Sequence, residues 1–234
     1  MKKIIFMLIC FSIISCKDMT QDDRLWKNGI IPFKFANFDA DKATKLYESM
    51  AIWEEGVKRA NKGKSLIKFI DMTGKDTSDY PKILYVSFID LKDMVGAITD
   101  TKYYKSHASM KLYINTNKDS DDNIKFIYCH ELGHILGLDI HEFQRKDRDV
   151  YLKIDYNFIL SKSLFYISQF FIRDPLFYDI ESYDFDYFSC MMCMEDVMIE
   201  VLMNPLPQIV YSLVTPSPTD FKKVRDIYFN NYYL

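Results

Sequence analysis

The spacing of apolar residues predicts a chain of mixed helices and strands. Residues 41–61 carry apolar side chains at the three- and four-residue intervals of a helix, at Leu46, Met50, Trp53 and Val57. Short runs rich in β-branched and aromatic residues predict strands at 67–70, 83–89 and 111–115. The polar stretch 115–123 predicts a loop that leads into a second helix. We therefore expect one α+β domain.

The amino terminus has the pattern of a secretory leader. Two lysines precede the mostly apolar stretch from Ile4 to Ile14, which is too short to cross about 30 Å of hydrocarbon as a helix. Residues 1–15 are therefore predicted to be a signal peptide. The ending Ile13-Ile14-Ser15-Cys16 resembles a bacterial lipobox, in which the cysteine is lipidated; a plain signal peptide with an incidental cysteine is the alternative.

This leader predicts the domain boundaries and the location of the protein. Residues 16–25 are predicted to form a lipidated tether that begins at Cys16, and residues 26–234 are predicted to form one folded domain, which carries the candidate chemistry described below. Lipidation at Cys16 places the domain at a bacterial cell envelope, on the outer membrane or the cell surface, with the membrane reached through the lipid anchor alone. We expect a monomer.

Composition and cysteine content indicate what kind of protein this is. Of the 234 residues, 49% are hydrophobic, which is typical of a globular domain, and the formal charge of −3 excludes nucleic acid as a partner. Of five cysteines, Cys129, Cys190 and Cys193 remain once the leader and Cys16 are set aside. Cys190 and Cys193 can form a disulfide or be two buried thiols, and we favour the thiols.

Candidate chemistry lies in the run His130-Glu131-Leu132-Gly133-His134. Residues four apart share one face of a helix, so His130 and His134 can bind one ion while Glu131 stands beside it as a general base. Gly137 tolerates positive φ and suits a turn that returns His141 as a third ligand. Three protein ligands leave the fourth position of a tetrahedral zinc ion for water, as catalysis requires.

This stretch resembles the astacin-like zinc endopeptidases, which belong to the metzincins. The likeness continues into the family's HExxRxDRD run through Glu142, Arg145, Asp147, Arg148 and Asp149. One departure is the presence of three residues, rather than two, between Gly137 and His141. Because every later motif residue keeps its spacing from His141, we interpret this as one extra residue in the turn. About a hundred residues earlier, Trp26 to Phe33 resembles the family's opening strand.

The resemblance implies a zincin-like fold. It predicts a twisted mixed sheet with packed helices, an irregular C-terminal lobe and an active-site cleft between them. The strand at 111–115 would be the edge strand that lines this cleft, where a substrate backbone can add as a further strand. The run from Phe185 to Met191 resembles the family's methionine turn, which would place Met191 beneath the zinc as an apolar floor.

The implied function is a zinc-dependent endopeptidase that hydrolyses peptide bonds of protein or peptide substrates with one Zn²⁺. His130, His134 and His141 would hold the zinc, and Glu131 would be the catalytic base. After Met191 the family continues with His-Tyr, whereas this chain has Met192-Cys193, so the tyrosine that stabilises the oxyanion is missing. The alternative is therefore a catalytically impaired surface lipoprotein that uses the same fold to bind peptides or glycans.

Glu142 is expected to have a structural role. In the resembled family, the carboxylate after the third histidine meets an amino group freed by removal of a propeptide. A lipidated Cys16 cannot supply that group, and an unpaired buried carboxylate is costly. The sequence therefore predicts that Arg145 and Arg148 pair with Glu142.

Overall fold

The computed structural model describes residues 25–89, 96–104, 107–113, 121–154, 171–192, 199–201 and 215–232. The leader, Cys16 and Cys193 lie outside these ranges. Predictions about the signal peptide, the lipid and the cysteine after the methionine turn therefore stay predictions.

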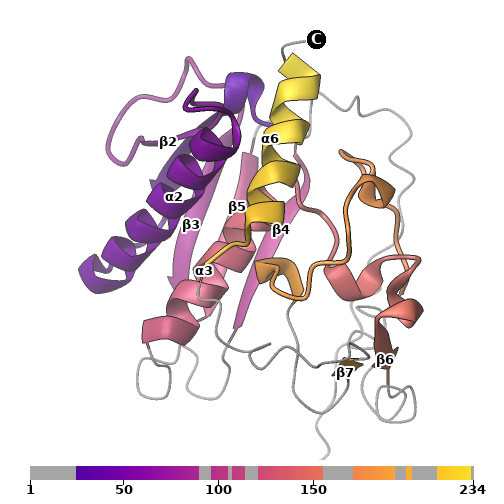
Figure 1. The fold of residues 1–234 in the computed structure, drawn as a ribbon. Coiled ribbons are helices and arrows are strands. Elements are labelled where there is room, and N and C mark those ends of the chain that lie inside the picture. The colour runs from indigo at the N-terminus through magenta and orange to yellow at the C-terminus, as the bar shows by residue number, and fades with distance from the viewer. Residues whose placement is uncertain are drawn as a thin grey trace, which may run out of the picture.

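A five-stranded mixed sheet organises the described N-terminal part, in the order β2-β1-β3-β5-β4 (Figure 1). Its strands are β1 (Ile30–Phe35), β2 (Lys68–Asp71), β3 (Ile83–Ile89), β4 (Gly96–Tyr104) and β5 (His107–Tyr113). The pairs β1–β2, β1–β3 and β3–β5 are parallel, and β4 runs antiparallel to β5. The predicted strands at 67–70 and 83–89 correspond to β2 and β3.

The described helices are α2 (Ala40–Ala60), α3 (Asp121–Ile135) and α6 (Pro218–Tyr232). Helices α2 and α3 contact the sheet, and α6 packs against α2. Helix α2 begins where the Asp39 carboxylate accepts the backbone N–H of Lys42 at 3.1 Å, and its predicted apolar face is buried. Gly56 leaves room for Phe221, so α6 approaches α2 closely. Figure 1 shows α6 lying between α2 and the C-terminal segments.

In the residues that the structure describes between α3 and α6, the C-terminal part is irregular. They contain one small antiparallel sheet of β6 (Leu152–Ile154) and β7 (Ile199–Val201). The other regular elements described between α3 and α6 are short 3₁₀ turns, named η2 (Glu142–Gln144), η3 (Arg148–Val150), η4 (Ile180–Ser182) and η5 (Cys190–Met192). A further turn, η1 (Lys27–Gly29), precedes β1. The expected α+β architecture is confirmed, with a mixed sheet, packed helices and an irregular lobe.

The prediction of the edge strand was wrong. The strand expected at 111–115 is the end of β5, which ends at Tyr113 and lies between β3 and β4, so β4 is the edge strand on this side of the described sheet and β2 is the edge strand on the other. Strand β4 was missed because the link between the two strands is Lys105-Ser106, which lacks the glycine or asparagine that marks a tight hairpin turn. A register irregularity between Asp100 and Tyr104 also interrupts the ladder.

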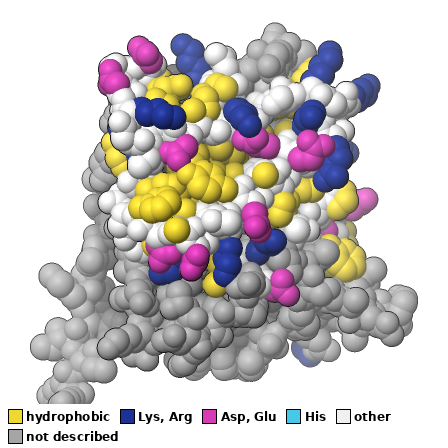
Figure 2. Space-filling view, turned by 90° about the vertical axis from the view of Figure 1, so that its left-hand side faces the viewer, with side chains coloured by type: hydrophobic (Ala, Val, Ile, Leu, Met, Phe, Trp, Pro, Cys, Tyr) yellow, Lys and Arg dark blue, Asp and Glu magenta, His cyan; other side chains and the backbone are white. Residues whose placement is uncertain are grey.

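No described histidine side chain is visible on the face of the molecule that carries α2. Figure 2 shows this face, where hydrophobic side chains gather in the middle with both signs of charge around them. In the part of the chain that the structure describes, no helix combines the length and apolar character needed to cross a membrane.

Candidate metal centre

Helix α3 presents the first two predicted ligands from its last two turns. His130 and His134 lie one turn apart, with ring centroids 4.8 Å apart and ring planes almost perpendicular. The opposite side of α3 is buried in the hydrophobic core through Ile124, Tyr128, Leu132 and Ile135. Two tryptophans fix the helix by donating indole N–H bonds: Trp53 to the Cys129 carbonyl in the middle of α3 at 3.0 Å, and Trp26 to the Ile135 carbonyl at its carboxyl end at 2.8 Å.

The chain leaves α3 through a Schellman motif at Gly137. The N–H of Leu138 donates to the Gly133 carbonyl at 2.9 Å, and the N–H of Gly137 donates to the His134 carbonyl at 3.1 Å. Gly137 has φ +103°, a conformation that side chains disfavour. The helix therefore ends where the sequence predicts, and the chain reverses at the expected residue.

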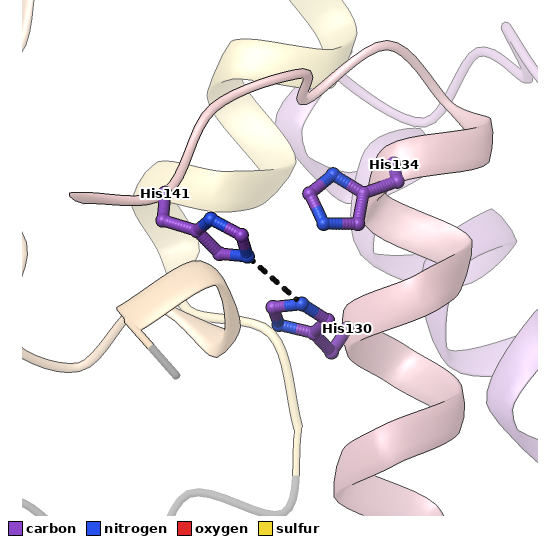
Figure 3. A group of neighbouring side chains, drawn as sticks. All are labelled: His130, His134 and His141. Carbon is purple, nitrogen blue, oxygen red and sulfur yellow. Dashed lines mark hydrogen bonds between the residues drawn. The ribbon is translucent and has the colours of Figure 1, made fainter. Parts of the chain in front are cut away.

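This reversal brings His141 back to the other two histidines. Its ring centroid lies 5.0 Å from that of His130 and 5.0 Å from that of His134. One nitrogen from each of the three rings lies within 4.8 Å of the others, and Figure 3 shows the rings converging on a common point. The extra turn residue is absorbed without displacing His141. Asp139 in that turn accepts the Leu176 N–H at 3.0 Å instead of joining the cluster.

Each imidazole is held by its Nδ1 atom. The partner of His130 Nδ1 is the Cys190 carbonyl at 2.8 Å, that of His134 Nδ1 is the Leu138 carbonyl at 2.7 Å, and that of His141 Nδ1 is the Gln144 side-chain oxygen at 3.2 Å. These oxygens only accept hydrogen bonds, so each Nδ1 donates and each Nε2 keeps its lone pair. This is the tautomer in which metal-ligating histidines are found.

The lowered pKa values of two of the histidines also fit a metal site. Desolvation, followed by the charge of His130, lowers the pKa of His134 to about 3. Desolvation, followed by the charges of His134 and His130, holds the pKa of His141 well below its usual value. The Nε2 atoms of His130 and His141 face each other at 3.2 Å, where two lone pairs repel unless a cation lies between them (Figure 3). Three converging imidazoles match the donor set that zinc prefers.

Met191 lies against the ligand-bearing helix, as the methionine-turn prediction requires. It is buried in η5, and a β-carbon added to Gly133 would lie only 2.6 Å from its sulfur. The absence of a side chain at Gly133 therefore lets Met191 pack beneath α3. Burial raises the pKa of Cys129 to about 12 and that of Cys190 well above its usual value, so both are inert thiols.

The start of α6 is tied to this turn by a buried carboxylate. Asp220 accepts hydrogen bonds from the Ser189 hydroxyl at 2.6 Å and from the Cys190 N–H at 2.9 Å. Asp220 and Ser217 also form a reciprocal capping box, with backbone-to-side-chain distances of 3.0 Å in both directions. Because the Cys190 carbonyl contacts the Nδ1 atom of His130, Asp220 supports the position of His130 indirectly, through Cys190.

Glu142 is buried, and its partners differ in part from the prediction. Arg145 lies 3.4 Å from one carboxylate oxygen, as expected, but the other oxygen contacts the ammonium of Lys223 on α6. Arg148 does not pair with Glu142 in the structure; its guanidinium donates to the Phe143 carbonyl at 2.8 Å. That part of the prediction was wrong, because Arg148 is turned toward the backbone of its own loop.

Sequence reasoning missed Lys223, Asp220 and Gln144 as supports of the site. The sequence did contain a sign that Lys223 is buried. It lies three residues after Asp220, directly before the apolar Val224 and four residues before the apolar Ile227. Helical spacing places it on the buried side of α6 with them. A lysine at such a position needs a partner, and the partner is a carboxylate distant in sequence.

Known proteins resemble this chain in sequence and in fold. The zinc metalloproteinase nas-39 of Caenorhabditis elegans is 30% identical over 151 residues, which are 60% of this chain and 14% of that protein. High choriolytic enzyme 1, a hatching enzyme zinc-protease from the medaka fish Oryzias latipes, superposes with a TM-score of 0.59 at 21% identity, covering 90% of this chain and 96% of that one. Myroilysin gives a TM-score of 0.54 at 17% identity, covering 88% and 95%.

The family comparison covers most of the chain. The sequence model of the peptidase family Astacin matches residues 18–201, a range that includes the three converging histidines and Met191. These findings agree with the geometry of the metal centre, and the protein therefore belongs to the astacin family of peptidases.

Proposed function

We propose that this protein is a zinc-dependent endopeptidase that cleaves protein or peptide substrates. The observation that carries the proposal is the convergence of three imidazoles, each with its Nδ1 atom held by an oxygen atom and its Nε2 atom directed at one point. His130, His134 and His141 would hold one Zn²⁺. Three protein ligands leave one position open, as in catalytic zinc sites.

When bound, the zinc supplies Lewis acidity that polarises the scissile carbonyl and lowers the pKa of water. The chain supplies proton transfer. Glu131 follows His130 on α3 and is buried beside the cluster. Its carboxylate accepts a proton from the attacking water and later delivers that proton to the leaving amine.

The edge strand gives the substrate a place to bind. Strand β4 is paired on one side by β5 and ends the described sheet. Its other edge can pair with an extended substrate backbone, which would align a peptide by main-chain hydrogen bonds. We assign this role to β4, in place of the strand expected from the sequence.

Replacement of Glu131 tests the enzymatic function. Glu131→Ala should keep about one zinc per chain and its fold, yet cleave a peptide library about 10² to 10⁴ times more slowly, because it removes only the general base. Metal analysis and cleavage rates measure the two effects. Glu55→Ala on α2, where the carboxylate is 55% exposed, is the control and should cleave like the parent. Equal rates for parent and Glu131→Ala would rule out the enzyme.

The residue at position 193 indicates a slow enzyme and not an inactive one. Cys193 stands where the resembled family has a tyrosine, and loss of one oxyanion donor typically slows catalysis by about 10² to 10³. We therefore expect a slow endopeptidase. A zinc-loaded parent with no cleavage at all would instead support a surface protein that binds peptides or glycans.

We also assign the protein to a bacterial cell envelope, anchored through lipid on Cys16. The support is the sequence Ile13-Ile14-Ser15-Cys16 after a short apolar stretch. In a bacterial host, labelled fatty acid should enter the parent and be absent from Cys16→Ser. Label that persists in the Cys16→Ser protein would contradict the anchor and leave the endopeptidase proposal untouched.

A further inference from the structure

The third histidine is followed by a cluster of buried charges that the catalytic chemistry does not use. Glu142, Lys223 and Arg145 are 3%, 1% and 2% exposed. Such side chains are almost never fully buried unless they are paired. Each of these three buried charges must therefore have partners that compensate for its loss of water.

Lys223 is the main partner of Glu142. Arg145 lies 3.4 Å from Glu142, but it donates two bonds of 2.8 Å to Asp147 and further bonds to the carbonyls of Tyr183 and Asp184. The shortest hydrogen bonds of Arg145 are thus made to Asp147 and not to Glu142. The ammonium of Lys223 contacts the other Glu142 oxygen directly.

Lys223 is held by a rigid platform. The next residue, Val224, is fully buried, and so is Ile227 one turn later. The capping box of Ser217 and Asp220 fixes the start of the same helix. The rings of Tyr178 and Tyr183 lie 5.9 and 5.8 Å from the ammonium, within the range of cation–π attraction. Lys223 can therefore hold Glu142 at a fixed place relative to the core.

The position of Glu142 determines that of His141. The two residues share a peptide bond at the start of η2, a turn of only three residues. The turn also provides Gln144, whose side-chain oxygen accepts the His141 backbone N–H at 2.9 Å and contacts its Nδ1 atom. A displacement of Glu142 would move the turn and the imidazole with it.

We propose that Lys223 is a positioning residue for the metal centre: through Glu142 it holds His141 where the third imidazole meets the other two. The inference rests on the proposed zinc site but not on peptide cleavage. Outer partners of metal ligands typically contribute about 10- to 100-fold to metal affinity. We expect a loss of that size when Lys223 is replaced.

The test measures zinc affinity by competition with a chelator, on purified full-length protein shown to be folded by circular dichroism. Lys223→Met should bind zinc about 10- to 100-fold more weakly than the parent. Lys222→Met, at the exposed neighbouring position of the same helix, should bind zinc like the parent. Val224→Ala removes core contacts from α6, and should lower the melting temperature without weakening zinc binding by the folded protein.

A double variant separates positioning from stability and remains useful if Lys223→Met does not fold. Glu142→Gln with Lys223→Met leaves no unpaired charge in that pair, so its melting temperature should exceed that of Lys223→Met. If the pair positions His141, zinc binding stays weak despite the regained stability. Parent-like affinity in the double variant, or equal weakening by Val224→Ala, would overturn the proposal. Normal zinc binding without peptide cleavage in the parent would contradict the endopeptidase function alone.

Discussion

The two segments that carry the histidines are held in place by different forces. Helix α3, with His130 and His134, is fixed by its own backbone hydrogen bonds and by a buried apolar face. The turn that carries His141 has no regular element longer than three residues. It is fixed by buried charges and side-chain hydrogen bonds, chiefly those of Glu142, Arg145 and Lys223.

The difference shows how each segment responds to change. Apolar contacts are numerous and individually weak, so a core tolerates small substitutions at modest cost. A buried polar network depends on every member, because loss of one partner leaves another unsatisfied. The turn can nevertheless accept an added residue, since Asp139 is tied outward to Leu176 and His141 keeps its place. We therefore expect the metal centre to be most sensitive on the His141 side.

The largest effect on the metal centre is expected at the junction between helix α3 and the turn that carries His141. Gly137→Ala places a side chain at φ +103°, and its β-carbon would lie 3.1 Å from a methyl group of Leu25. The free energy of unfolding should fall by about 1–3 kcal/mol through backbone strain. Zinc binding should weaken about tenfold or more, because the turn carries His141. Urea unfolding and chelator competition measure the two quantities.

A matched glycine provides the control for this prediction. Gly74 also has positive φ, +72°, but a β-carbon there meets nothing within 4 Å. Gly74→Ala should lower stability by about 1–2 kcal/mol and leave zinc affinity unchanged. If Gly137→Ala binds zinc as tightly as Gly74→Ala does, the conformation of the turn does not control the position of His141.

The contrast between the two segments also explains what the sequence could predict. Ligands on α3 follow from local rules, since four-residue spacing places His130 and His134 together on any helix. The return of the chain at Gly137 is also local, because a glycine after an apolar run is a typical helix end. The same holds for the apolar face of α2, where Leu46 and Trp53 are buried as expected. The α+β class followed from these elements together.

The remaining features depend on partners far apart in the chain. Glu142 and Lys223 are 81 residues apart, and nothing in the local pattern identifies which of several cations reaches the carboxylate. Arg148 was expected there on proximity alone, but its guanidinium satisfies the Phe143 carbonyl instead. The edge position of β4 is likewise set by pairing with β5, which strand propensity does not determine.

A smaller effect is expected where the polar network reaches the surface. Asp147 receives two 2.8 Å hydrogen bonds from Arg145, and these bonds lower the pKa of its carboxyl. A carboxyl whose pKa is lower in the folded state stabilises the fold above its unfolded pKa of about 3.9, and this contribution is lost as the pH falls below that value. Because the Asp147 side chain is 42% exposed, the contribution should be at most about 1 kcal/mol.

Asp147→Asn tests whether this outer contact behaves as a charge pair. Urea unfolding of the metal-free protein should show the variant less stable than the parent at pH 7 by up to about 1 kcal/mol. The difference should shrink as the pH falls through 4 toward 3, where the parent carboxylate is progressively protonated. Zinc affinity should change far less than in Lys223→Met, because Asp147 contacts Arg145 and not Glu142. A stability difference that stayed constant across this pH range would show that Asp147 acts through shape or neutral hydrogen bonding, and the charge network that holds the turn would then be confined to its buried members.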